Sequence, residues 1–312
     1  MSARQRRSRV EGPDGWTTIS SRRNRRSRAL MAHQSDLAHD GAGDDVPADE
    51  PAPTEAEIAI VTARLQKQIA AFNESSCCAK LKELVRSEVG SRVLAHPSSS
   101  QDGDGDAELQ VSDDEAGISN VLIIALGSLS ESFSGAPGHQ LAAALTIIDV
   151  LRELNTASPS PNQQEMQILS YDPVYTAMDK HILSTFDITP VPASKIPHAY
   201  DSEWYRKALV YMPHGSVWLN HDYFIRRPRI WIGNSFTLYD SAMATFRADE
   251  AAGMPDNSDK DDELLIRTLR EAEKVAEEYR VVDWPDAEYG GGQAFNNVVV
   301  YVREHGEDGS TA

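Results

Sequence analysis

The sequence contains little of what an extracellular, membrane-spanning or zinc-binding protein requires. Only two of its 312 residues are cysteine, Cys77 and Cys78, and adjacent cysteines are poorly placed to bridge each other. We therefore expect structural thiols in a reducing compartment. The longest uninterrupted apolar run, Val121 to Leu126, is far shorter than a membrane span of about 20 residues. The arginine-rich N-terminus lacks a signal-peptide pattern, so we predict a cytoplasmic and nuclear protein with no membrane partner.

Positive charge is also scarce outside the N-terminus. The formal net charge is -18, and such an acidic body argues against non-specific binding to nucleic acid. The exception is a basic arm, because the first thirty residues hold nine arginines, five of them between Arg22 and Arg28. This arm predicts a nuclear import signal or a weak nucleic-acid contact, and the alternative is a solvated disordered tail; these interpretations stay open.

Four segments lack the apolar content that a folded core needs, and we expect them to be disordered. They are the basic and then acidic arm of residues 1–53, an acidic linker at 96–117, an acidic insertion at 248–262 and a tail at 303–312.

A helical segment at 54–95 separates the first two of these segments. Thr54 and Glu57 form a capping-box pattern, and apolar residues then recur every three or four positions at Ile58, Val61, Leu65, Ile69 and Phe72. One apolar stripe needs a partner surface. We expect it to dock on the main domain, and the alternative is a partner protein.

Between residues 118 and 302, short apolar runs alternate with longer helical patterns. Such runs are typical of strands buried on both faces and joined by crossover helices. The fold class predicted is α/β: a Rossmann-like three-layer domain with a mostly parallel sheet, preceded by the disordered arm and the amphipathic helix. The predicted strands are 120–126, 166–171, 187–191, 208–212, 229–233 and 297–302, and the predicted helices lie near 138–154, 174–184, 217–224, 237–247 and 263–279.

Unusual polar turns follow four of these strands. Open parallel sheets bind ligands outside the carboxyl ends of their strands, near a switch in strand order. The first turn opens a loop of four serines ahead of a helix whose free N–H groups favour an anion. Each turn alone is explained by chain reversal or helix capping, but together they favour a pocket. The predicted ligand-binding residues in these turns are Gly127, Ser128, Asp172, Pro173, His214, Gly233, Asn234 and Ser235.

His214 is the candidate residue with the largest number of possible chemical roles. It could act as an acid or base with Asp172 as partner, ligate haem or a metal, or donate a hydrogen bond. A catalytic nucleophile is weakly supported, since no Gly-x-Ser-x-Gly elbow is present. We predict no metal site, because the other candidate ligands have no characteristic spacing; they are His139, His181, His198 and His221.

Six ordered motifs carry a family resemblance. They are "VLIIALGSLSES", "HQLAAAL", "YDPVYTAMDKHIL", "VYMPHGSVWLN", "IWIGNSFTLY" and "AFNNVVVYV". In this order they resemble the SRR-like domain, named after the plant "sensitivity to red light reduced" protein. The likeness covers 118–302 in register and, loosely, 14–28. It adds Gln140 to the candidate ligand-binding residues. Many relatives carry cysteine after the histidine, where this chain has Gly215, which weakens any His–Cys ligation of haem or metal.

The resemblance implies regulation rather than an established reaction. The plant member is tied to phytochrome signalling and the circadian clock, animal relatives to haem biosynthesis, and the yeast relative to microtubule-related phenotypes. We therefore expect a non-enzymatic regulatory protein that binds an unidentified ligand or protein partner at the strand ends. One alternative is an enzyme of methyltransferase-like fold that binds S-adenosylmethionine or a nucleotide. A second is an interaction scaffold that uses the helix of residues 54–72. The cofactor is unknown, with haem ligation by His214 or His139 as a weaker hypothesis.

Overall fold

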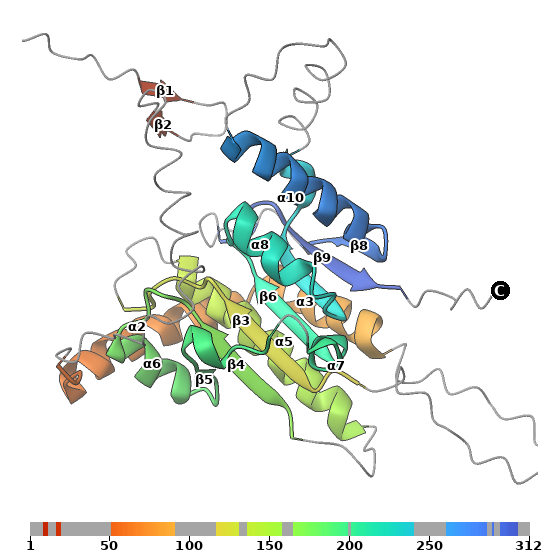
Figure 1. Cartoon of the computed structure of the whole chain (residues 1–312). Coiled ribbons are helices and arrows are strands. Elements are labelled where there is room, and N and C mark those ends of the chain that lie inside the picture. Colours follow the sequence, from red (N-terminus) through yellow and green to blue (C-terminus); the bar gives the residue numbers. More distant parts are fainter. Residues whose placement is uncertain are drawn as a thin grey trace, which may run out of the picture. The chain divides into compact units, whose positions relative to one another are not determined.

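The structure of the chain is a computed structural model (Figure 1), and it describes residues 9–11, 17–19, 51–90, 117–130, 136–157, 165–198, 201–239, 260–285, 289 and 294–304. Several predictions fall outside the described residues. These concern the arginines of the basic arm, the acidic linker, most of the acidic insertion, the tail beyond residue 304, and the serines Ser132 and Ser134.

The chain divides into two units, residues 1–48 and residues 49–312. In the first unit the described elements are β1 (Arg9–Glu11) and β2 (Thr17–Ile19), which pair antiparallel with Arg9 opposite Ile19. This short pair lies within the arm that the composition predicts to be disordered. The other elements all belong to the second unit.

The predicted amphipathic segment forms helices that pack on the main domain. Thr54 caps α2 (Glu55–Asn73) through the expected reciprocal bonds with Glu57, and α3 (Ser76–Val85) and the π-helical turn η1 (Arg86–Gly90) follow. Leu65 and Phe72 are buried in the same apolar cluster as the residues of α5 (Ala136–Ala157). Because this stripe faces the domain itself, it is not free to dock another protein, and the helix is part of the core.

A seven-stranded sheet forms the centre of the domain. Its strands in chain order are β3 (Asn120–Ile124), β4 (Gln167–Tyr171), β5 (Thr189–Pro190), β6 (Ala208–Met212), β7 (Ile230–Asn234), β8 (Tyr279–Asp283) and β9 (Val298–Arg303). Across the sheet they lie in the order β5-β4-β3-β6-β7-β9-β8. Pairing is parallel from β5 to β7 and antiparallel at β7–β9 and β9–β8. This is the mostly parallel sheet that the sequence predicts.

Alternate residues of the strands bury themselves in two apolar clusters, one on each face. In β3, Val121 and Ile123 join the cluster with α5, α2 and α3, whereas Leu122 and Ile124 join the cluster on the opposite face. All five residues of β6 are buried. Burial on both faces explains why these strands are continuous apolar runs.

Helices cover the two faces of the sheet (Figure 1). On the first face, α6 (Ala177–Ser184) joins the apolar cluster of α5 and α2 through Ile182 and Leu183. The second face is covered by α7 (Ser202–Arg206), α8 (Val217–Phe224) and α10 (Lys260–Ala276). The predicted three-layer arrangement is therefore confirmed.

Some boundaries and elements differ from the prediction. Strand β8 was not predicted, because Tyr279 continues the apolar spacing of Leu269, Ala272 and Val275 and is typical of a last helical turn. In the structure α10 ends at Ala276. The five residues of α7 were also missed, and α10 begins at Lys260, inside the predicted acidic insertion. Of the helix predicted at 237–247, the described part is a short 3₁₀ turn, η4 (Phe236–Tyr239). Within the described residues no helix has the length and apolar character to cross a membrane.

Truncating Phe72 tests whether α2 belongs to the core. Its ring is 0 % exposed and packs edge-on against Tyr289 at 5.3 Å between centroids. We expect Phe72→Ala to lower the free energy of unfolding by about 3–5 kcal/mol, measured by chemical denaturation of the full chain. Ile60→Ala on the same helix is the control, since Ile60 is 70 % exposed and should change stability by less than about 0.5 kcal/mol. Equal effects of both substitutions would contradict the docking of α2.

Candidate functional site

The turn after β3 is bonded to the turn after β4. Gly127 has φ +76°, a conformation that glycine adopts without strain. Its N–H donates to Oδ2 of Asp172 over 2.8 Å, while Oδ1 of the same carboxylate accepts from the N–H of Val174 at 3.0 Å. Asp172 therefore shapes both turns, and its carboxylate does not pair with His214 as the sequence allowed. Pro173 is exposed beside it.

A second, buried carboxylate holds the next part of the β3 turn. Asp179 is 0 % exposed and accepts from the N–H of Ser130 over 2.8 Å. Its other oxygen accepts from the N–H and the hydroxyl of Thr176, both at 3.0 Å, as part of the capping box of α6. The hydroxyls of Ser128, Ser130 and Thr176 form a chain with spacings of 3.1 and 3.2 Å. Arg64 of α2 donates to the carbonyls of Leu129 and Ser130 from the other side.

These bonds determine what the N–H groups of the serine turn itself can bind. The anion site predicted from the sequence uses instead the free N–H groups of the helix that follows the turn, and it stays a prediction. In the structure the N–H groups of Gly127 and Ser130 already donate to carboxylates. A phosphate placed there would compete with two aspartates for the donors and would be repelled by their charge.

The turn after β6 exposes its histidine and buries its glycine. Pro213 and Gly215 are buried, whereas His214 is exposed at the carboxyl edge of the sheet. A Cβ atom at position 215 would lie 2.2 Å from Sδ and 2.8 Å from Cγ of Met212, which is 0 % exposed. A side chain at 215 is thus sterically excluded while Met212 keeps this packing. That is a physical reason for glycine at the position where the resemblance led us to look for cysteine.

Two asparagines fix the carbonyl of Gly215. Nδ2 of Asn220 in α8 donates to it over 2.6 Å, and Nδ2 of Asn234 at the end of β7 donates over 3.0 Å. Asn234 therefore ties the β7 turn to the β6 turn. Asn220 is 1 % exposed and its Oδ1 has no hydrogen-bond partner. Sequence reasoning missed Asn220, which it treated only as part of a helix.

The two remaining candidates of the β7 turn have structural roles. A Cβ atom on Gly233 would lie 2.6 Å from Nε1 of Trp231, so this glycine makes room for the indole. The hydroxyl of Ser235 accepts from the N–H of Thr237 and contacts its hydroxyl at 2.7 Å, which is local turn stabilisation. The N–H of Ser235 donates to the carbonyl of Asn297 over 2.8 Å.

Gln140 connects α5 to the loop between β8 and β9. It is 2 % exposed, and its Nε2 donates to the carbonyl of Ala294 over 3.0 Å, while its own carbonyl accepts from the hydroxyl of Tyr211. Neighbouring His139 accepts at Nδ1 from the hydroxyl of Tyr289, or donates to it, over 2.9 Å. Burial lowers the pKa of His139 and raises the pKa of Tyr289. Both groups are therefore neutral near pH 7, and the tautomer of His139 decides which of them is the donor. No pattern in the sequence indicated this pair, whose members lie 150 residues apart in the chain.

All nine predicted site residues lie at the carboxyl edge of the sheet or at the start of α5, which follows β3 there. Hydrogen bonds link some of them in two groups: Gly127 with Asp172, and Asn234 with the Pro213–Gly215 turn. No bond joins Asp172 to His214. Their strands flank β3 on opposite sides, which separates the two strands by about 10 Å.

The described donors provide neither the His–Cys pair considered for haem nor a cluster of ligands for a metal ion. Both cysteines are buried in α3, where Sγ of Cys77 donates to the carbonyl of Pro285, so neither can join His214 as a thiolate ligand. His139 is half-buried and bonded to Tyr289. Among the described residues no group of three histidine, cysteine, aspartate or glutamate side chains could hold a metal ion.

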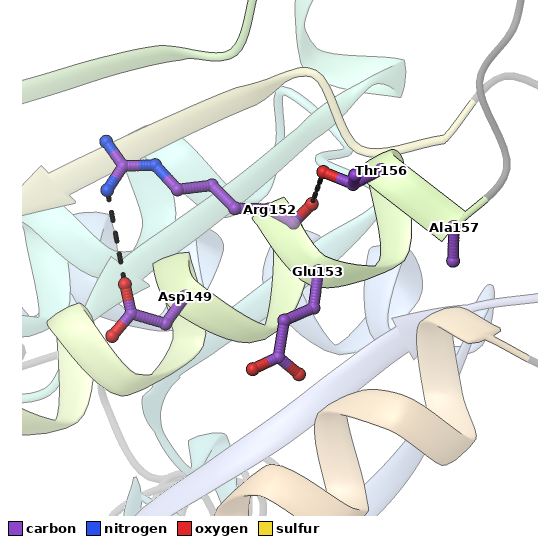
Figure 2. Close-up of a pocket in the computed structure, with 5 residues that line it drawn as sticks. All are labelled: Asp149, Arg152, Glu153, Thr156 and Ala157. Atoms are coloured by element: carbon purple, nitrogen blue, oxygen red, sulfur yellow. Dashed lines mark hydrogen bonds and ion pairs between the residues drawn. The ribbon is translucent and has the colours of Figure 1, made fainter.

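A shallow surface hollow lies at the other end of α5, away from the strand-end turns. It is lined by Asp149, Arg152, Glu153, Thr156 and Ala157 (Figure 2). Arg152 lies 4.0 Å from Asp149 and 3.6 Å from Asp187, and all three side chains are exposed. Such exposed pairs contribute little and form no enclosed site. The hollow follows from the solvated face of the helix.

Comparison with known proteins places the chain in a family. Its fold is a Rossmann-like α/β domain with polar turns gathered at one sheet edge. The family model of the SRR1 domain matches residues 81–302. The match covers more than half of the chain, and the protein therefore belongs to the SRR1-domain family. It begins at Leu81 in α3, so this helix is part of the family domain. Neither the curated proteins nor the solved structures gave a match.

Substitution of Gly215 tests the packing of the β6 turn. We expect Gly215→Ala to destabilise the protein by about 1–3 kcal/mol, because the added methyl group overlaps the Met212 side chain. In Gly215→Ala/Met212→Ala the overlap is gone, so the two changes should be clearly less than additive in denaturant titrations. His214→Ala serves as the control and should be close to neutral, since this side chain is exposed. Full additivity would show that the turn does not depend on this contact.

The His139–Tyr289 pair predicts a pH effect with a definite sign. The pKa of His139 is lowered in the folded protein, so the unfolded chain binds this proton more readily. Its contribution to stability is therefore full above the ordinary histidine pKa of about 6.5 and is lost as the pH falls below it. We expect NMR titration of the imidazole C–H signals to show a midpoint below that of the unfolded chain. Because burial is what lowers the pKa of His139, the midpoint in Tyr289→Phe should stay below that of the unfolded chain. A wild-type midpoint at or above the unfolded value would refute the assignment.

Proposed function

We propose that this SRR1-domain protein is a non-enzymatic regulator that binds a small ligand at the carboxyl edge of its sheet. One observation carries the proposal: the turns after β3, β4, β6 and β7 lie at one edge beside the switch point between β3 and β6. At such a point the chain leaves neighbouring strands in opposite directions, and ligands of open α/β sheets bind in the crevice between them.

The turns on each side of the switch point are held in place before any ligand arrives. Asp172 fixes Gly127 on one side, and Asn220 and Asn234 fix the carbonyl of Gly215 on the other. Fixed turns lower the entropy that a ligand must remove on binding. The exposed His214 stands on the second of these turns and can donate to or accept from a ligand.

A regulatory role suits this arrangement better than acid–base catalysis. Both oxygens of Asp172, the carboxylate considered from the sequence as the acid–base partner of His214, accept backbone N–H groups and shape the two turns. For this chain we propose, as in the relatives named by the resemblance, control of a signalling or biosynthetic pathway, with light and clock signalling or haem biosynthesis as the two candidates.

Two measurements test the proposal. The full-length chain, purified from its native host, is expected to carry a small molecule that native mass spectrometry detects and denaturation releases. His214→Ala should reduce its occupancy at least tenfold and abolish rescue of a host strain that lacks the protein. His181→Ala is the matched control, because His181 is also exposed but lies in the last turn of α6. If no molecule is bound and His214→Ala rescues fully, the proposed site is wrong.

A further inference from the structure

The order of the strands indicates which classes of ligand the sheet resembles in its binding. Numbered along the chain, β3 to β9 are strands one to seven, and their order across the sheet is 3-2-1-4-5-7-6. The seventh strand is antiparallel to both of its neighbours. Dinucleotide-binding sheets have the order 3-2-1-4-5-6. A reversed seventh strand between the fifth and sixth is instead the arrangement of Rossmann-like methyltransferases, and the switch point is the same. A fold does not define a ligand, so the choice between these ligand classes depends on the side chains at the carboxyl edge of the sheet.

Those side chains disfavour a phosphate. In dinucleotide sites the turn after the first strand offers its N–H groups to a pyrophosphate. Here the corresponding N–H groups, of Gly127 and Ser130, each donate over 2.8 Å to a carboxylate. Arg64, the cation nearest to this turn in the described contacts, donates to two of its carbonyls. The whole chain carries a net charge of -18, which further opposes a polyanionic nucleotide.

The same side chains suit a ribose. Asp172 follows the second strand, where nucleotide-binding folds place an acid for the ribose hydroxyls. Each of its oxygens accepts one backbone N–H, and a carboxylate oxygen has lone pairs for a second donor. The hydroxyl chain of Ser128, Ser130 and Thr176 lies next to it and can exchange hydrogen bonds with further polar groups.

Unpaired polar atoms mark the other side of the switch point. Among the buried side chains described, three polar atoms lack partners: Oδ1 of Asn220, Nε1 of Trp231 and Nε1 of Trp284. Trp284 belongs to the apolar cluster on the opposite face, so the first two concern this edge. The amide of Asn220 lies under the β6 turn, and Nε1 of Trp231 lies where a side chain on Gly233 would stand. Buried groups without partners are uncommon in folded proteins, and an absent bound molecule is one explanation. One atom is an acceptor and the other a donor, which fits a ligand that carries an ammonium and a carboxylate.

We propose that the ligand is a phosphate-free adenosine derivative with a cationic amino-acid arm, of which S-adenosylmethionine is the test compound. Its ribose contacts Asp172, and its charged arm extends toward the turns after β6 and β7. This inference rests on the proposed ligand site at the strand ends and adds the chemical identity of what binds there. It concerns binding and includes no methyl transfer.

Calorimetric titration of the full chain with S-adenosylmethionine, adenosine, ATP and NAD tests the inference. We expect S-adenosylmethionine to bind at least tenfold more tightly than ATP or NAD, and adenosine to bind weakly. Asp172→Asn should weaken S-adenosylmethionine at least tenfold, because it replaces a carboxylate acceptor by an amide. Asp149→Asn is the control, since the exposed Asp149 lines the separate hollow on α5.

A second measurement uses the wild-type chain, so its result does not depend on correct folding of the Asp172→Asn variant. Hydrogen exchange should slow at residues 125–130 and 172–176 when S-adenosylmethionine is added. Binding of ATP or NAD as tightly as S-adenosylmethionine, or equal exchange with and without it, would overturn the ligand assignment. The proposed ligand site would survive that result if a different molecule co-purifies and depends on His214. If no molecule co-purifies and His214→Ala has no effect, both the ligand assignment and the proposed ligand site are wrong.

Discussion

Burial of the sheet on both faces is the constraint on which the other features depend. A strand such as β6, with every residue buried, can carry polar chemistry only where it ends. Parallel pairing then brings the ends of β3, β4, β6 and β7 to one edge. The polar residues at these ends are consequently gathered at one edge of the sheet, although more than a hundred residues separate Gly127 from Ser235.

Backbone donors and acceptors at this edge are satisfied mainly by side chains from the adjacent turn. Asp172 and Asp179 receive N–H groups of the β3 turn, and Asn220 and Asn234 donate to the carbonyl of Gly215. Except for the bond of Asn220, which lies five residues from Gly215, these bonds link elements that are well separated in sequence, so the turns depend on one another. The edge is better described as a cross-linked frame than as a row of flexible loops, and α2 extends that frame through Arg64.

The sheet could be predicted from sequence because periodicity reports burial directly. The apolar runs predicted the positions of β3, β4, β6, β7 and β9. Strand β8 was not predicted, because an exposed edge strand produces no such run. The location of the site residues followed from strand direction. The hydrogen-bond partners of these residues could not be predicted, because the N–H groups that Asp172 accepts depend on side-chain geometry across two turns. The His139–Tyr289 pair was equally out of reach, since it requires the path of a loop that no pattern specifies.

The two outer strands also determine how the protein behaves among its own copies. An unpaired strand edge can recruit another chain and start aggregation. Here β5 spans only Thr189–Pro190, and Pro190 has no N–H to offer a passing strand. At the opposite end, β8 carries the charged residues Arg280 and Asp283, and Arg280 forms an ion pair with Glu88 beyond α3. One edge is too short to extend and the other is charged, so the sheet stops at seven strands and resists edge-to-edge polymerisation.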